Sequence, residues 1–172
     1  SVREITERRR REREYEQIFH GVSDGLVVHD PETGEILDAN DTYLDIVGYD
    51  DVGTVRDLGI GGLSATEEGY TAERGRAVIT GVAARGDPET VEWRVERRDG
   101  ERRWLEATVA PATVGGERRV LSINRDVTER RRREREYEQI FEMAGDGIVV
   151  HDPETGAVVD VNRQVADLLG YD

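Results

Sequence analysis

Apolar and polar residues alternate most clearly in the second half of the chain, with a period of two residues. The stretches 91–96 and 104–109 each place apolar side chains at every second position. Arg98-Asp99-Gly100 lies between them and is typical of a hairpin turn, and Gly115-Gly116 leads into a further apolar stretch at 118–125. The pattern therefore predicts three consecutive antiparallel strands.

The first fifty residues show shorter segments that are separated by strong turn residues. Residues 25–29 are predicted as a strand, Asp30-Pro31-Glu32-Thr33-Gly34 as a turn, and 35–38 as the returning strand. A short helix is predicted from Asn40 to Val47, because Asn is a favourable N-cap and the Gly48 that follows is a favourable helix stop.

The middle of the chain predicts one helix after a glycine-rich stretch at 51–65, which we expect to be irregular. The helix is predicted over 66–84, and its apolar face consists of Gly75, Val78, Ile79 and Val82. Strands, then helices, then three strands indicate an α+β fold with helices on one face of the sheet. The other face bears Trp104, and we expect helix 6–19 or a second subunit to cover it.

Two parts of the chain are close copies of each other, at an offset of 122 residues. Residues 6–50 and 128–172 align without a gap, and 30 of the 45 positions are identical. The start of the chain, V-R-E-I-T-E-R at 2–8, is similar to N-R-D-V-T-E-R at 124–130. We therefore expect the chain to be part of a longer tandem array.

This interpretation divides the chain into four parts. They are the end of a preceding unit with its linker helix at 1–14, a complete domain at 15–126, a linker helix at 127–141, and the amino-terminal part of a second domain at 142–172. The second copy ends before it can build most of a sheet, so we expect its strand Ile148–Val150 to be exposed or paired with a neighbour.

Composition excludes several classes of protein. The chain has 38 acidic and 24 basic residues, a net charge of −14, and every basic residue is arginine. This charge disfavours nucleic acid and anionic membranes as partners, and no apolar run approaches the ~20 residues of a membrane span. The acidity and the missing lysine favour a halophilic source, with a GC-rich genome as the other explanation of the arginine bias. We expect the protein to be cytoplasmic.

The repeated segment T-E-R-R-R-R-E-R-E-Y-E-Q-I-F is rich in helix formers, with opposite charges four residues apart. It fits a signalling helix that pairs in a dimer, an arginine-rich segment that binds nucleic acid, or a solvated helical spacer. Acidic residues interleave with the arginines and weaken the second interpretation. The apolar positions make a poor coiled-coil seam, but a marginal helix pair can have two packings of similar energy, so we favour the first.

The order of these motifs resembles the PAS sensor domain. The resemblance rests on the strand, the D-P-E-T-G turn, the returning strand, N-x-x-Y/V before G-Y, W-R-x-x-R-R-D-G-x-x-x-W, and N-R-D-V-T-E-R. It covers 15–126 fully and 142–172 in part. It implies a five-stranded antiparallel sheet with helices on one face, around a small pocket. It also implies homodimers formed through linker helices and the sheet face, and a downstream histidine kinase or regulator domain as the partner in the same protein.

Members of this family bind haem, flavin or small metabolites, or no ligand. The chain has no cysteine, so thiol-linked chromophores and light-oxygen-voltage photochemistry are excluded. Haem needs an axial ligand, for which the histidines are His20, His29 and His151. Each also fits a simpler role, His29 and its copy His151 as polar strand ends and His20 as a boundary residue. We expect no cofactor, with haem or non-covalent flavin as the alternative.

The expected pocket wall combines the inward-facing apolar positions with two asparagines. The set is Asn40, Val91, Trp93, Val95, Leu105, Ala107, Val109 and Asn124. Simple core packing also explains the apolar members, an N-cap role explains Asn40, and backbone hydrogen bonds explain Asn124. The resemblance places Asn124 where flavin-binding relatives carry a glutamine. Trp93 is large enough to fill the cavity itself, which favours a small ligand or none.

The D-V-T triplet at 126–128 joins the last predicted strand to the outgoing helix. We expect Asp126 to cap that helix, Thr128 to add a contact in its first turn, and the pair to relay a change in the sheet. The chain contains no G-x-x-x-x-G-K-[ST], G-x-S-x-G or H-E-x-x-H motif, and we expect neither catalysis nor a metal site.

Two functions fit this sequence. The first is a sensory and dimerising module that couples ligand or conformational input to a downstream domain through a linker helix, with a pocket of roughly a few hundred Å³. The alternative is a redox or gas sensor that carries haem or flavin.

Overall fold

The computed structural model describes residues 1–171 and divides the chain into two compact units, Ser1–Val127 and Thr128–Asp172. None of the helices in the described range has the length and apolar character that a membrane span requires.

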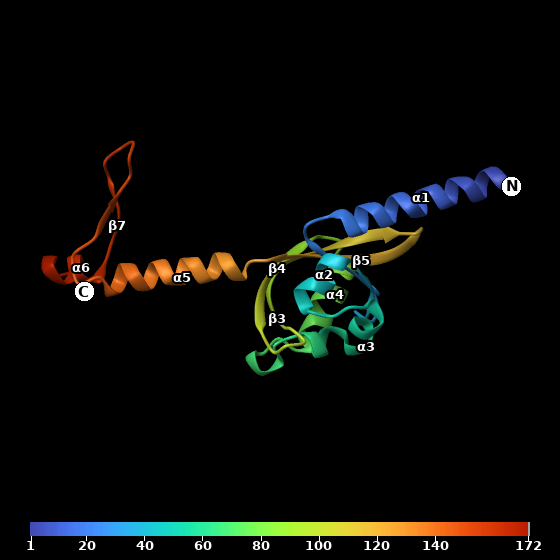
Figure 1. Cartoon of the computed structure of the whole chain (residues 1–172), viewed down its shortest axis with the longest axis horizontal. Coiled ribbons are helices and arrows are strands. Elements are labelled where there is room, and N and C mark those ends of the chain that lie inside the picture. The colour runs from blue at the N-terminus through green and yellow to red at the C-terminus, as the bar shows by residue number, and fades with distance from the viewer. Residues whose placement is uncertain (172) are drawn as a thin grey trace. The chain divides into compact units, whose positions relative to one another are not determined.

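The first unit contains one antiparallel sheet of five strands, as predicted (Figure 1). The strands are β1 (Gly25–His29), β2 (Ile36–Ala39), β3 (Glu89–Glu96), β4 (Arg102–Val114) and β5 (Glu117–Asp126). Their order across the sheet is β2-β1-β5-β4-β3, so the first strand pairs with the last. The sheet that bounds the core is therefore incomplete without β5, which joins β1 to β4.

Helix α1 (Val2–Gly21) precedes the sheet, and α2 (Asp41–Val47), α3 (Val52–Leu63) and α4 (Ala72–Arg85) follow β2. In Figure 1 the last three lie together on one side of the sheet. Asn40 and Gly48 cap α2 at its two ends, as the sequence predicts. The N-terminal helix is longer than the predicted 6–19.

The prediction of an irregular stretch at 51–65 is wrong. Most of the stretch forms α3, because Asp51 caps the helix through the N–H of Thr54, and Gly59 lets the helix kink at φ 61°. The prediction of one helix over 66–84 is wrong at its start. Thr66–Glu68 form a short 3₁₀ helix, and α4 begins only after its N-cap Thr71.

Trp104 on the outer face of the sheet is half-buried by residues of its own unit. The guanidinium of Arg94 lies 4.9 Å from the centre of the Trp104 ring, and the Tyr70 ring meets it edge-on at 5.9 Å. Neighbouring strand residues and the loop before α4 thus cover this ring, in place of helix 6–19.

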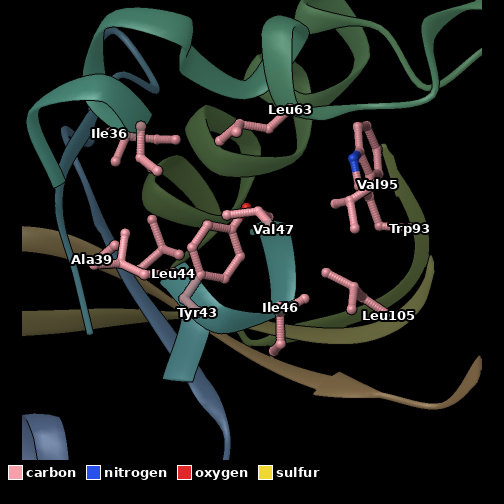
Figure 2. Close-up of a cluster of buried hydrophobic side chains, with 12 residues drawn as sticks. Ile36, Ala39, Tyr43, Leu44, Ile46, Val47, Leu63, Trp93, Val95 and Leu105 are labelled. Atoms are coloured by element: carbon pink, nitrogen blue, oxygen red, sulfur yellow. The ribbon is translucent and has the colours of Figure 1, made fainter. Parts of the chain in front are cut away.

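The main apolar cluster lies between the inner sheet face and the helices (Figure 2). Trp93, Val95 and Leu105 contribute from β3 and β4, as the alternation predicts, and α2 contributes Tyr43 and Val47. Figure 2 shows the Tyr43 ring in the middle of this cluster.

The second unit consists of α5 (Thr128–Met143), β6 (Val149–His151), β7 (Val158–Val161) and α6 (Arg163–Leu169). Its two strands form a separate hairpin sheet. Val149 is 40% exposed and Val158 is 58% exposed. Of the predicted strand Ile148–Val150, Val149 is exposed and the two residues beside it are half-buried.

Candidate functional site

A cavity of about 60 Å³ lies between the inner sheet face and helices α2 to α4. Five of the eight predicted pocket residues line it, namely Val91, Trp93, Ala107, Val109 and Asn124. Val95 and Leu105 belong to the adjoining apolar cluster instead. The cavity is much smaller than the few hundred Å³ expected, because Trp93 and the apolar residues of α4 fill most of the space under the sheet.

His29 lies on this cavity wall, buried to 4% exposure. Its Nδ1–H donates to the carbonyl oxygen of Gly34 at 3.1 Å, which leaves the lone pair of Nε2 as the free acceptor. Burial lowers the pKa of His29 to about 4, although the bond to Gly34 acts in the opposite direction. The ring is therefore neutral at pH 7. The prediction that His29 is simply a polar strand end is incomplete. His29 lies two residues after Val27 in β1, so strand alternation puts both side chains on the inner face of the sheet.

Tyr43 also lies on the cavity wall, and its position in α2 was not predicted to matter. Burial raises the pKa of its hydroxyl well above the ordinary value, so the group is a hydrogen-bond donor at any physiological pH. Within residues 1–171 the hydroxyl makes no hydrogen bond, although the side chain is only 7% exposed. A buried donor of this kind needs a partner.

Asn124 lies on the wall, as expected, and backbone groups satisfy much of its side chain. Its NH₂ group donates to the carbonyl oxygen of Gly25 at 3.1 Å and to the hydroxyl oxygen of Ser122 at 2.7 Å. The indole N–H of Trp93 donates to the hydroxyl of Ser64 at 2.8 Å. These bonds fix the wall around His29 and Tyr43, while the side-chain oxygen of Asn124 makes no hydrogen bond within residues 1–171.

Asn40 does not line the cavity, which corrects its place in the predicted pocket. It is fully buried where three elements meet. Its NH₂ group donates to the carbonyl oxygens of Phe19 and Asp24 at 2.8 and 3.0 Å. Its side-chain oxygen accepts from the N–H groups of Leu26 and Tyr43 at 2.8 and 2.9 Å. One side chain thus joins the end of α1 to β1 and to α2.

The outgoing end of the sheet has its own attachment. Asp126 is the last residue of β5, and its carboxylate accepts from the guanidinium of Arg103 on β4 at 3.0 Å. The N–H of Val127 donates to the carbonyl oxygen of Trp104 at 2.8 Å, and α5 begins at Thr128. The position directly before the helix is therefore Val127, one residue beyond Asp126.

Neither haem nor flavin fits the cavity as it stands. A site for a drug-sized ligand has about 300–1,000 Å³, several times the volume present here. Within residues 1–171, no charged side chain lines the cavity, and no group of three or more metal-binding side chains occurs. The free Nε2 of His29 is a suitable iron ligand, but the surrounding apolar wall leaves no room for a macrocycle.

Comparisons with known proteins agree with this fold. A family model described as PAS domain matches residues 23–129, and a second PAS domain model matches residues 135–172. No curated protein matches the sequence significantly.

Among solved structures, the chain is similar to the PAS domain of an HTR-like protein from Haloarcula marismortui. The TM-score is 0.60 at 23% identity, over 73% of this chain and 99% of that one. A domain of a sensory box sensor histidine kinase/response regulator from Geobacter sulfurreducens gives 0.52 at 25% identity, over 67% and 94% of the two chains. A PAS domain from Colwellia psychrerythraea gives 0.54 at 25%, over 68% and 97%. Because a PAS domain model matches more than half of its residues, this chain belongs to the PAS domain family.

Proposed function

We propose that this chain is a sensory module that passes a change at the cavity to the helices at the two ends of the PAS domain. The module acts as a homodimer in the cytoplasm of a halophile, and the output is a histidine kinase or regulator domain of the same protein. It is not itself a catalyst. The observation that carries the proposal is the buried attachment of the incoming helix, through Asn40, to the sheet that bounds the cavity.

The incoming helix is attached by Asn40. Because this side chain is fully buried and bonds α1, β1 and α2 at once, α1 cannot turn relative to β1 without breaking a buried hydrogen bond. β1 carries His29 on the cavity wall, so the attachment links the cavity to α1 within a few residues.

On the outgoing side, Asp126 at the end of β5 accepts a hydrogen bond from Arg103 on β4, two residues before the inward-facing Leu105. A ligand that spreads β4 and β5 would change the direction in which the chain enters α5. Thr128 is the first residue of that helix, and we propose that Asp126 and Thr128 form the relay.

Dimerisation is supported by apolar side chains that water surrounds in a single chain. On α1 these are Val2, Ile5 and Ile18, at 82%, 55% and 67% exposure. On α5 they are Tyr137, Ile140 and Met143, at 56%, 72% and 83%. Helices with such positions commonly bury them against a second copy. In molar KCl, light scattering should give twice the chain mass of 19.4 kDa; a monomer at all concentrations would contradict dimerisation.

Spin labels test the coupling, because the chain has no cysteine and labelled sites can be introduced singly. One label is placed at Thr108 on β4 and one at Arg133 on α5. Ala107→Ile fills part of the cavity and should shift the distance distribution between the labels. Asp126→Ala should abolish the shift, whereas Glu4→Ala, at the corresponding position of the repeat in the first turn of α1, should not. An unchanged distribution in folded Ala107→Ile would overturn the coupling.

A further inference from the structure

Besides the side-chain oxygen of Asn124, two complementary polar functions on the cavity wall make no hydrogen bond with a residue of the described chain. Nε2 of His29 is an acceptor and the Tyr43 hydroxyl is a donor, on side chains exposed by only 4% and 7%. Buried groups of this kind are almost always paired with protein, water or ligand. Apart from that oxygen, the polar side chains of the wall are hydrogen-bonded within the chain, and the other residues are apolar.

The size of the cavity limits what can pair with these groups. A cavity of about 150 Å³ takes benzene with its six carbons, so 60 Å³ has room for roughly two to four non-hydrogen atoms. No charged side chain lines the cavity within residues 1–171. An ion would lose its hydration without gaining a counter-ion, which is strongly unfavourable, so the occupant is neutral.

We infer that the cavity binds a small uncharged molecule of the amide or alcohol class, which donates a hydrogen bond to Nε2 of His29 and accepts one from the Tyr43 hydroxyl. This inference rests on the proposed sensory function and names its input. The ligand reaches β1 through His29 and α2 through Tyr43, two of the three elements that Asn40 joins.

The second copy of the repeat offers a matched control. His151 corresponds to His29 and makes the same bond from Nδ1 to the carbonyl oxygen of Gly156 at 3.1 Å, but it is exposed. Val165 stands where the first copy has Tyr43. The second copy therefore has the histidine but neither its burial nor the tyrosine donor.

The experiment titrates the full chain with acetamide and with acetone in molar KCl, and follows the ¹⁵N resonances of the histidine rings. The two probes have the same number of non-hydrogen atoms, but acetone has no N–H to donate. Acetamide should shift Nε2 of His29 saturably with a millimolar Kd, and acetone should bind at least about tenfold more weakly. His151 should not shift.

Variants then separate ligand binding from coupling. Tyr43→Phe should weaken acetamide about tenfold at His29, and His151→Leu should leave the Kd unchanged. If acetamide and acetone shift Nε2 equally, or neither shifts it saturably, the inference is overturned and water fills the cavity. If acetamide binds but the Thr108–Arg133 distance distribution does not change, the ligand assignment stands and the proposed coupling fails.

Discussion

Residues 19–49 and 141–171 are identical at 16 of 31 positions, and in both the asparagine before the short helix is fully buried. Asn162 donates to the carbonyl oxygen of Phe141 at 2.9 Å and accepts from the N–H of Ile148 at 2.9 Å, as Asn40 does with Phe19 and Leu26. These bonds form without the remaining strands of a PAS sheet. They are therefore a property of the local sequence.

Apolar burial differs sharply between the same two regions. Val27 is 1% exposed and its copy Val149 is 40% exposed, while Val47 and its copy Leu169 are 0% and 66% exposed. The first copy has β3, β4, β5 and two more helices to pack against, whereas the second has only its own hairpin and helices. The polar junctions therefore depend on residues that are close in the sequence, whereas the core and the cavity depend on strands and helices that lie far along the chain.

The largest expected effect comes from replacing the buried asparagine before the short helix, Asn40 or Asn162, in each copy. Asn40→Ala leaves four buried backbone groups unpaired and should destabilise the first unit by about 3 kcal/mol. Asn162→Ala should leave the denaturant midpoint unchanged when it is followed by tryptophan fluorescence, because Trp93 and Trp104 both lie in the first unit. Equal shifts for the two variants would contradict the comparison.

Acid should expose the difference between the two histidines. The unfolded chain binds a proton on His29 near pH 6.5, and the folded chain only near pH 4, so stability is full above pH 6.5 and is lost as pH falls toward 4. Between pH 7.5 and pH 5 the loss should be about 2 kcal/mol relative to His29→Gln, in urea titrations. The His151→Gln variant should lose as much unfolding free energy over this pH range as the parent chain, because His151 is exposed. A His29→Gln variant with the same pH profile as the parent would disprove this origin.

Truncation of matched apolar side chains should have a similar or smaller effect. Val27→Ala removes two buried methyl groups from the core and should cost about 2 kcal/mol, lowering Tm by roughly 6–12 °C. Val149→Ala should change Tm little, because its side chain is already partly in water. Calorimetry of both variants checks the prediction, and comparable losses of Tm would mean that the second copy has a core of its own.

The smallest expected effect is one that the two copies share. Arg8 and Glu12 form an exposed ion pair at 3.1 Å in α1, and Arg130 and Glu134 form the matching pair at 3.9 Å in α5. Replacing either arginine by glutamine should lower helix stability by at most about 0.5 kcal/mol, and by less in molar salt. Circular dichroism at low and high KCl measures this, and a large effect in only one helix would show a tertiary role.

The difference between features set by neighbouring residues and features set by distant strands also explains which parts of the structure can be predicted from the sequence. Alternation placed the strands and the inward face, and the cap of Asn40 follows from its own neighbours along the chain. The kinked helix α3 was missed, since its four glycines hide a helix that packing against β2 and α4 stabilises. The roles of His29 and Tyr43 were missed because β5 and the helices bury them, and those elements lie far along the chain. The residue that joins α1 to the sheet was placed in the pocket instead.

Amide hydrogen exchange at Leu26 and Ile148 tests the central claim most directly, because each N–H donates to its own buried asparagine at 2.8 or 2.9 Å. In the 172-residue chain, the Leu26 amide should exchange only through global unfolding of the first unit. The Ile148 amide should exchange at least about a thousandfold faster, through local opening. Equal protection of the two amides would show that burial by the later strands does not set the stability of the junction.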